Sequence, residues 1–274
     1  MNVGAALALA QARGLERLDA QLLLAELLGC NRAWLITHAD QMLSDEVSAR
    51  LLDWLGQRLD QVPLAYLSGH KEFHGLRLAV DAHTLVPRPD TEVLVDWALE
   101  LLPGWPAPQA VDLGTGSGAI ALACKARHPA VSMTMTDFSA PALAVAVANA
   151  QSLGLAVEAL QGSWFTPLAG RQFDLILGNP PYIAGDDPHL PALRHEPLSA
   201  LTPGGDGLDA LRAIVAGAPQ HLRPGGWLLL EHGFDQQEAV TALLAAAGFE
   251  AIAGRRDHGN QPRASGARWG SAGR

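Results

Sequence analysis

The sequence predicts an α/β protein with a mostly parallel sheet and crossover helices, preceded by a small all-helical domain and a linking β-hairpin. Apolar residues first recur at helical spacing, then alternate briefly after Pro63. From Ala110 onward, short apolar runs alternate with helical patterns. The chain has 274 residues, 49% of them apolar and 17% charged. It is therefore long enough to bury a sizeable core, and its composition excludes a disordered protein.

The first part of the chain has the spacing of amphipathic helices. From Val3 to about Gln61, apolar residues recur at steps of three and four. The pattern breaks near Gly14, at Gly29 to Asn31, and before Ser44, which is a typical helix N-cap residue. We assign residues 1–62 to a helical domain without a cluster of polar site residues.

Residues 63–90 form the expected hairpin linker. Its segment from His70 to His74 is similar to the motif of zinc-binding helices. That motif needs a glutamate directly after the first histidine, but here Lys71 follows His70 and the glutamate is Glu72. The flanking glycines Gly69 and Gly75 favour a strand instead. We therefore expect no metal site.

Residues 91–274 carry the alternating pattern. Two further runs at the end, Phe249 to Ala253 and Arg263 to Trp269, add a hairpin and bring the expected strands to seven. The other expected strands are 110–113, 131–136, 157–160, 173–177 and 227–230. The expected helices are 119–127, 141–152, 208–221 and 236–247.

Charge and cysteine usage limit the functional classes. The formal net charge is −9, so the chain lacks the positive field of an electrostatic nucleic-acid binder and strong nucleic-acid binding is not expected. Cys30 and Cys124 lie in apolar helical patterns without a metal-ligand partner, as buried small hydrophobes do. No basic residue precedes the apolar stretch from Val3 to Ala10, and the longest charge-free stretch is interrupted by polar residues. We expect a cytoplasmic protein without a membrane segment.

A glycine-rich loop follows the first strand of the α/β region. Asp112 precedes Gly114, Thr115, Gly116 and Gly118, and a helix starts directly afterwards. Glycines let the backbone approach a ligand, and the helix N-terminus supplies free N–H groups. The glycine spacing also satisfies a dinucleotide-binding pattern. The carboxylate of Asp112 favours the ammonium group of a methionine moiety instead, because it would repel a pyrophosphate.

Asp137 ends the next strand, at the position where such folds bind ribose hydroxyls with a carboxylate. An N-cap role competes with this interpretation, although Ser139 explains the cap better. The residue therefore indicates a cofactor that carries a ribose.

The sharpest motif is Asn179-Pro180-Pro181-Tyr182, directly after the fourth strand. Two prolines stiffen the turn and remove two N–H donors, so carbonyl groups face the cleft. The side-chain oxygen of Asn179 and the carbonyl of Pro180 suit the two hydrogens of a planar NH₂ group, on which Tyr182 stacks. Holding both hydrogens helps an amide nitrogen to pyramidalise toward a sulfonium methyl group.

Together these motifs resemble the S-adenosylmethionine-dependent methyltransferases that act on planar nitrogens. The segments Pro63 to Leu67 and Pro87 to Glu92 extend the match to the peptide chain release factor N5-glutamine methyltransferases, and it covers nearly the whole chain. The resemblance implies a Rossmann-like class I methyltransferase domain with S-adenosyl-L-methionine as cofactor. It also implies a helical domain that docks class I release factors 1 and 2, whose Gly-Gly-Gln glutamine is the substrate.

The resemblance also assigns roles to single residues. The catalytic residues are Asn179, Pro180 and Tyr182. Substrate binding falls to these three with Pro181, Arg88 and Glu92. The cofactor-binding residues are Asp112, Gly114, Thr115, Gly116, Gly118, Asp137, Trp164 and Asn179.

Three positions depart from the family pattern. Ser163 stands where an aspartate often precedes Trp164, His195 replaces a usual phenylalanine, and residues 258–260 alter a terminal motif. The first puts a polar contact to adenine in question, whereas none of them touches the Asn179 motif.

Two alternatives stay open at this point. A nucleic-acid methyltransferase acting on adenine N6 or guanine N2 would use the same acceptor platform, and Arg255, Arg256, Arg263 and Arg268 would supply a local basic patch. A binding module that retains the fold without turnover is the other. The net charge disfavours the first, and the intact Asn179 motif beside an intact glycine loop disfavours the second.

Overall fold

A computed structural model describes residues 1–270, so the last four residues of the expected domain 91–274 lie outside the described part. The chain divides into two compact units, Met1–His70 and the residues from Lys71 onward. The division into domains at residues 62 and 90 stays a prediction.

The N-terminal unit is all-helical, which confirms the expected helical module. Asn2, Asn31 and Ser44 accept hydrogen bonds from backbone N–H groups at the starts of three of its helices. Its core is made mostly of leucines, including Leu23 and Leu55, which are fully buried. The helices are α1 (Val3–Ala12), α2 (Arg17–Leu28), α3 (Arg32–Thr37), α4 (Asp45–Leu59) and α5 (Leu64–Ser68).

Helix α5 corrects the expected extent of the hairpin. Residues 64–68 were expected in the linker, but they form a helical turn after Pro63, whose ring fixes φ. Gly69 ends this turn in the left-handed conformation. The hairpin itself contains only β1 (His70–Phe73) and β2 (Leu76–Ala79).

The second unit contains a seven-stranded sheet in the order β5-β4-β3-β6-β7-β9-β8. All strands are parallel except β9, which pairs antiparallel with both β7 and β8. This confirms the expected mostly parallel sheet and its terminal hairpin. The strands are β3 (Gln109–Leu113), β4 (Ser132–Asp137), β5 (Glu158–Gln161), β6 (Phe173–Gly178), β7 (Leu222–Glu231), β8 (Glu250–Arg256) and β9 (Pro262–Arg268).

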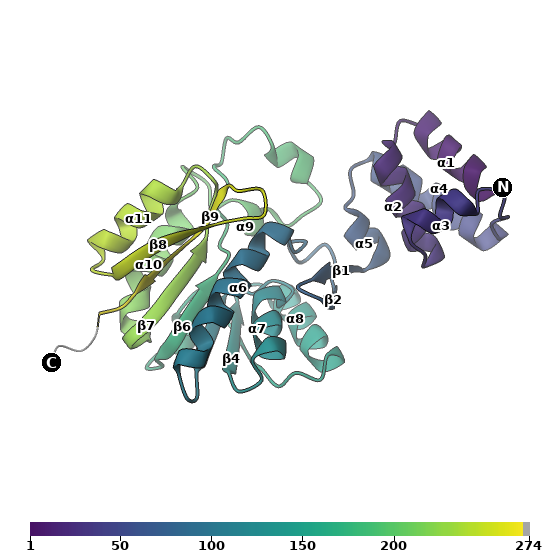
Figure 1. Ribbon diagram of the computed structural model, residues 1–274. Coiled ribbons are helices and arrows are strands. Elements are labelled where there is room, and N and C mark those ends of the chain that lie inside the picture. The colour runs from purple at the N-terminus through teal and green to yellow at the C-terminus, as the bar shows by residue number, and fades with distance from the viewer. Residues whose placement is uncertain (271–274) are drawn as a thin grey trace. The chain divides into compact units, whose positions relative to one another are not determined.

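Helices cover both faces of this sheet (Figure 1), and a separate hydrophobic core lies between the sheet and the helices on each face. Strand residues alternate between the cores, so Leu175 and Leu177 of β6 pack under α6, α7 and α8, whereas Ile176 packs under α10 and α11. The helices are α6 (Glu92–Leu101), α7 (Ala119–Arg127), α8 (Ala140–Ser152), α10 (Asp209–His221) and α11 (Gln237–Ala246).

Helix α6 was not among the expected helices. Its buried residues Leu94, Val95, Trp97 and Ala98 have helical spacing. The short 3₁₀ segment Pro89–Thr91 leads into it. The remaining short helices are the 3₁₀ segments Leu102–Gly104, Thr166–Leu168 and Leu190–Leu193 and the α-helix α9 (Leu198–Leu201).

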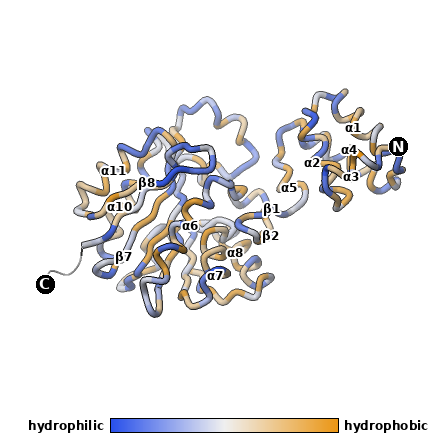
Figure 2. Tube along the Cα trace, in the orientation of Figure 1, coloured by the Kyte–Doolittle hydropathy of each residue, from blue (hydrophilic) through white to orange (hydrophobic). Residues whose placement is uncertain are grey.

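Hydropathy follows this layering. Figure 2 shows hydrophobic residues along strands such as β7, whereas the turn between β8 and β9 is hydrophilic. Among the described residues, no helix is long and apolar enough to cross a membrane.

The strand order fixes where a ligand can enter. β3 is flanked by β4 and β6, so the loops that leave β3 and β6 diverge at the carboxyl edge of the sheet. Open parallel sheets bind ligands in the crevice formed at such a reversal of strand order. The glycine loop and the Asn-Pro-Pro-Tyr motif are these two loops.

Candidate active site

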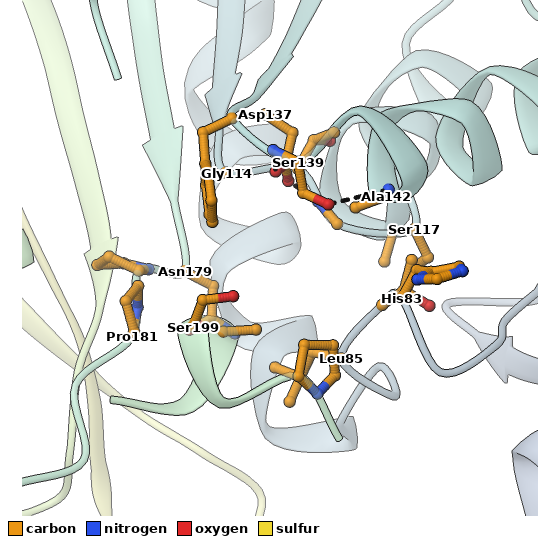
Figure 3. A pocket seen from close by; sticks show the side chains of 18 of the residues that line it. His83, Leu85, Gly114, Ser117, Asp137, Ser139, Ala142, Asn179, Pro181 and Ser199 are labelled. Carbon is orange, nitrogen blue, oxygen red and sulfur yellow. Dashed lines mark hydrogen bonds between the residues drawn. The ribbon is translucent and has the colours of Figure 1, made fainter. Parts of the chain in front are cut away.

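A cavity of about 440 Å³ occupies this crevice. Figure 3 shows Gly114 and Asp137 on one side of it and Asn179 with Pro181 on another. The cavity therefore brings together the loops that follow β3, β4 and β6. Its lining includes Arg88, Thr115, Gly116, Trp164 and Pro180.

The glycine loop depends on two close approaches of the backbone. Gly114 has φ +69°, and a Cβ there would lie 3.3 Å from the ring of Trp164. Gly118 has φ +85°, and a Cβ there would lie 2.9 Å from the side chain of Leu122. A side chain at either position would be strained, since such φ values suit glycine. Gly118 does not line the cavity, so it shapes the loop from behind.

Asp137 lies in the cavity wall and orders the loops around it. Its carboxylate accepts hydrogen bonds from the N–H of Gly116 at 2.9 Å and of Ser139 at 2.8 Å. Burial raises the pKa of this carboxyl, and these two N–H groups partly oppose the shift. Ser139 caps α8 through Ala142, as expected, so Asp137 is not needed as the cap.

Asp112 does not line the cavity. Its side chain is fully buried beneath the glycine loop, where Thr115 Oγ1 donates to Oδ2 at 2.6 Å. Burial raises the pKa of Asp112 to about 7, although the Thr115 hydroxyl and the Ala121 N–H lower it. Oδ1 has no hydrogen-bond partner among the described residues. The expected direct contact with an ammonium group is therefore not seen from this position, and the residue supports the loop from below.

The Asn-Pro-Pro segment forms part of the cavity wall. Asn179, Pro180 and Pro181 all line the cavity. The Asn179 Nδ2 donates to the hydroxyl of Thr91 at 3.3 Å, which leaves the Oδ1 oxygen to accept from a ligand. Because proline lacks an N–H, the carbonyl of Pro180 has no donor beside it from these two residues.

Tyr182 departs from its expected position. It is not among the lining residues, and its hydroxyl donates to Glu231 Oε1 at 3.1 Å. The ring packs with the core beneath α10 and α11. The motif therefore turns away from the cavity after Pro181, and stacking by Tyr182 on a planar substrate is not supported by this geometry.

The two residues expected from the segment 87–92 to bind substrate separate in the structure. Arg88 lines the cavity and forms an ion pair with the buried Glu196, which also accepts from the N–H of Val86 at 3.0 Å. Glu92 lies outside the cavity and accepts from the N–H of His74 at 3.0 Å. Glu92 begins α6, and this hydrogen bond directs its side chain to the hairpin.

Several lining residues escaped sequence analysis. They include His83, Leu85 and the segment around Ser199, which contributes Pro197 and Thr202 as well. Thr91 also lines the cavity, although only its charged neighbours Arg88 and Glu92 were expected to bind substrate. Prolines occur in the sequence near His83 and Leu85 and again around Ser199. They could have indicated these lining segments, because proline turns hold backbone groups rigidly beside a cleft.

The departures from the family pattern lie at the rim or away from the cavity. Ser163 lines it beside Trp164, which adopts φ +46°. Residues 258–260 form the turn between β8 and β9, closed by the hydrogen bond from Asn260 N to Asp257 O at 2.9 Å. His195 is not a lining residue and directly precedes Glu196.

The candidate metal and cysteine residues lie apart from this site. His70 faces Glu26 at 3.2 Å, whereas His74 faces Asp96 at 3.0 Å. Within residues 1–270, no group of three or more potential ligands is placed to hold a metal ion. Cys124 is fully buried in the core beneath α7 and Cys30 is partly buried, and burial raises the pKa of both thiols.

The four arginines that would supply a basic patch in the nucleic-acid alternative are held by other groups of the chain. Arg255 pairs with Glu100 at 2.6 Å, Arg263 with Asp257 at 3.0 Å and Arg268 with Glu250 at 3.4 Å. Arg256 donates to the carbonyl of Asn260 at 2.7 Å. The chain therefore offers little positive field here to a phosphate backbone.

Comparison with known proteins covers both units. Residues 4–69 match a family model described as the PrmC N-terminal domain, and residues 91–208 match the methyltransferase small domain. A solved methyltransferase from Pyrococcus furiosus has a TM-score of 0.54 at 16% identity, over 83% of this chain and 100% of its own. That likeness shows the class I methyltransferase fold.

Curated relatives share much more sequence. A release factor glutamine methyltransferase from Xylella fastidiosa is 48% identical, over 92% of this chain and 93% of its own. The one from Pseudomonas aeruginosa is 47% identical, over 92% of both chains. Since identity at this level extends over nearly the whole chain, the chain belongs to the family of release factor glutamine methyltransferases.

Proposed function

We propose that this protein transfers a methyl group from S-adenosyl-L-methionine to the side-chain N5 of the glutamine in the Gly-Gly-Gln motif of class I peptide chain release factors 1 and 2. The observation that carries the proposal is the acceptor platform of Asn179 and Pro180, which lines the same cavity as the glycine loop. Family membership favours release factors as the substrate. Such a substrate belongs to translation, which agrees with the expected cytoplasmic location.

The cavity residues fit the cofactor. Asp137 presents a carboxylate to ribose hydroxyls, Trp164 presents a ring beside an adenine, and the open face of Gly116 lets a ligand approach the backbone. S-adenosylmethionine supplies an electrophilic methyl group on a sulfonium. The protein's own contribution is to hold the acceptor nitrogen in line with that methyl group.

The platform selects and activates an amide nitrogen. Asn179 Oδ1 and the Pro180 carbonyl accept the two hydrogens of the glutamine NH₂, which fixes its plane. As the nitrogen loses conjugation and gains positive charge, both hydrogen bonds strengthen, so the platform stabilises the transition state more than the ground state. The N–C bond forms as the C–S bond of the sulfonium breaks, and the methylated nitrogen then releases one of its two protons to water. Asn179 is neutral, so it adds no charge beside a cationic cofactor.

The same platform fits adenine N6 or guanine N2, so the charges around it bear on the choice. Arg88 lies in the cavity wall but is paired with Glu196. The arginines of the final hairpin either form ion pairs or, in the case of Arg256, donate to a backbone carbonyl. Together with the net charge of −9, this arrangement disfavours a nucleic-acid substrate.

We further propose that the helical unit docks the release factor. Exposed apolar side chains on this unit include Leu18, Leu22, Ile36 and Met42. A glutamine loop alone offers little area, whereas a stable encounter between proteins buries on the order of 1,000 Å² or more.

The test is mass spectrometry of each release factor after incubation with the enzyme and S-adenosylmethionine. We expect a gain of one methyl group on the Gly-Gly-Gln glutamine and none on a release factor whose glutamine is replaced by glutamate. Asn179→Ala should lower kcat by about a hundredfold or more, with nearly unchanged cofactor affinity. Methylation of RNA with none on either release factor would overturn the proposal.

A further inference from the structure

A buried glutamate lies directly behind the acceptor platform. In the parallel pair of β6 and β7, Gly178 is opposite Leu230, so Asn179, the first residue after β6, lies next to Glu231, the last residue of β7, which also pairs with Ala264 of β9. Thr91, at the start of α6, accepts a hydrogen bond from Asn179 at 3.3 Å, and its hydroxyl also acts on the Glu231 carboxylate. Glu231 is 1% exposed and Thr91 is 4% exposed, so solvent has little access to these two side chains.

The hydroxyl groups around Glu231 act as hydrogen-bond donors to its carboxylate. Tyr182 donates its hydroxyl to Glu231 Oε1 at 3.1 Å, while Oε2 is buried without a hydrogen bond in the described part of the chain. The Thr91 hydroxyl interacts with the same carboxylate and lowers its pKa. A buried carboxylate oxygen that lacks a donor attracts the single proton of that hydroxyl.

This direction decides how Asn179 is oriented. A hydroxyl that points its proton toward Glu231 turns its lone pairs toward Asn179, and it can then only accept. The Asn179 Nδ2 donates to it at 3.3 Å, which agrees with this arrangement. A side-chain amide has nearly the same shape after a half turn, so packing alone does not separate its oxygen from its nitrogen.

We propose that Glu231 is a positioning residue, which through the Thr91 hydroxyl keeps the Nδ2 of Asn179 turned inward and the Oδ1 turned toward the substrate amide. The inference deepens the proposed function and rests on it. In the reversed orientation the platform would present an N–H to the substrate NH₂, which has no hydrogen-bond acceptor at its planar nitrogen to receive it.

The charges around Glu231 make this hydrogen-bond arrangement of Glu231, Thr91 and Asn179 sensitive to pH. Arg263 on β9 faces the carboxylate and also contacts Asp257 at 3.0 Å and Asp90 at 3.7 Å. Burial raises the pKa of Glu231 to about 7, opposed by the hydroxyls and by Arg263, whereas Asp90 adds to the rise. Burial, and to a smaller extent Arg263, lowers the pKa of the neighbouring His232, whose ring is bonded to Ser265 at 2.8 Å.

Protonation of Glu231 should therefore reverse the orientation of the Asn179 amide. A neutral carboxylic acid can donate to the Thr91 oxygen, which frees the hydroxyl proton to bond with the Asn179 oxygen. Turnover should thus fall as the pH falls through about 7, while cofactor binding changes less.

The experiment compares Glu231→Gln and Thr91→Val with the wild type. Both remove the fixed direction, because the glutamine amide can donate to Thr91 and valine has no hydroxyl. We expect kcat for a release factor to fall about ten- to a hundredfold, the range for hydrogen bonds to charged groups. The Kd for S-adenosylmethionine should stay close to that of the wild type, and the acidic limb of the kcat profile should disappear in Glu231→Gln.

Two further variants separate positioning from stability. Thr91→Ser keeps the hydroxyl and should restore most of the turnover. Asp174→Asn is the matched control, because Asp174 is also a buried carboxylate beside an arginine, Arg223, but lies at the start of β6, away from the cavity. It should leave kcat and its pH profile unchanged.

The outcomes are distinguishable. Wild-type kcat with an unchanged acidic limb in Glu231→Gln would overturn the inference, and so would equal losses in Asp174→Asn. If Glu231→Gln does not fold, normal turnover by Thr91→Val overturns it in the same way. A wild-type enzyme that methylates no release factor would instead refute the proposed function, on which the inference rests.

Discussion

The side-chain amide of Asn149 joins three parts of the second unit, and its removal gives a quantitative test of the structure. Asn149 lies on α8 and is 3% exposed. Its Oδ1 accepts from Ala79 N at 2.7 Å, and its Nδ2 donates to Ala79 O at 3.0 Å and to Ser117 O at 2.9 Å. The residue thus ties the end of the hairpin to the glycine loop.

Asn149→Ala removes all of these bonds, including the one to the carbonyl of the buried Ser117. At about 1 kcal/mol for each hydrogen bond, the loss is about 3 kcal/mol of unfolding free energy. This is a large share of the roughly 5–15 kcal/mol that stabilises a typical domain. Binding of S-adenosylmethionine should weaken as well, because Ser117 lines the cavity and its carbonyl loses its anchor.

Denaturant unfolding of the second unit measures the overall loss, and hydrogen exchange at the Ala79 amide measures it locally. Asn31→Ala is the matched control, since it removes a single bond, to Trp34 N at 2.9 Å, at an exposed helix start. It should cost only about 1 kcal/mol, in the helical unit. A loss in Asn149→Ala no greater than this, or unchanged exchange at Ala79, would refute the reasoning.

Two other predictions concern the buried acid and the helical surface. Because burial raises the pKa of Asp112 to about 7, the folded chain binds a proton there that the unfolded chain releases near pH 4. Its contribution to stability is therefore lost as the pH rises from about 4 to 7. Asp112→Asn should raise the denaturation midpoint of the ligand-free protein more at pH 8 than at pH 5, and an equal change at both would contradict the assignment. The double variant Leu18→Glu with Leu22→Glu, on exposed positions of α2, should raise KM for an intact release factor but not for a short Gly-Gly-Gln peptide; equal effects on both substrates would argue against docking.

The architecture of the sheet was largely predictable because its strands carry nearly uninterrupted apolar runs. The expected and observed strands differ by a residue or two at their ends, except β8, which ends three residues later than expected, and β7, which starts at Leu222 rather than near Trp227. This extension crosses Pro224 and Gly225, residues that normally argue against a strand. It forms because Leu222 pairs with Phe173, and because the N–H of Gly225 donates to Trp269 O at 3.0 Å.

The site was predictable wherever a short motif fixes the backbone. The glycine loop, Asp137 and Asn179 follow neighbouring strands and line one cavity, as parallel strand order requires. Sequence alone could not place Tyr182 or Glu92, because the directions of their side chains depend on partners far along the chain, Glu231 and His74. The roles assigned to the lining residues stay predictions until they are tested.

The position of β9 has a consequence for how the chain folds. This strand follows β8 in sequence but lies between β7 and β8 in the sheet. Until it has been synthesised, β7 has an open edge of unpaired N–H and C=O groups, and open edges invite pairing with other chains. The helical unit, by contrast, closes its core from neighbouring segments and can fold while synthesis continues. A slow ribosome over residues 232–261 would thus prolong the interval in which a half-finished sheet is prone to aggregate.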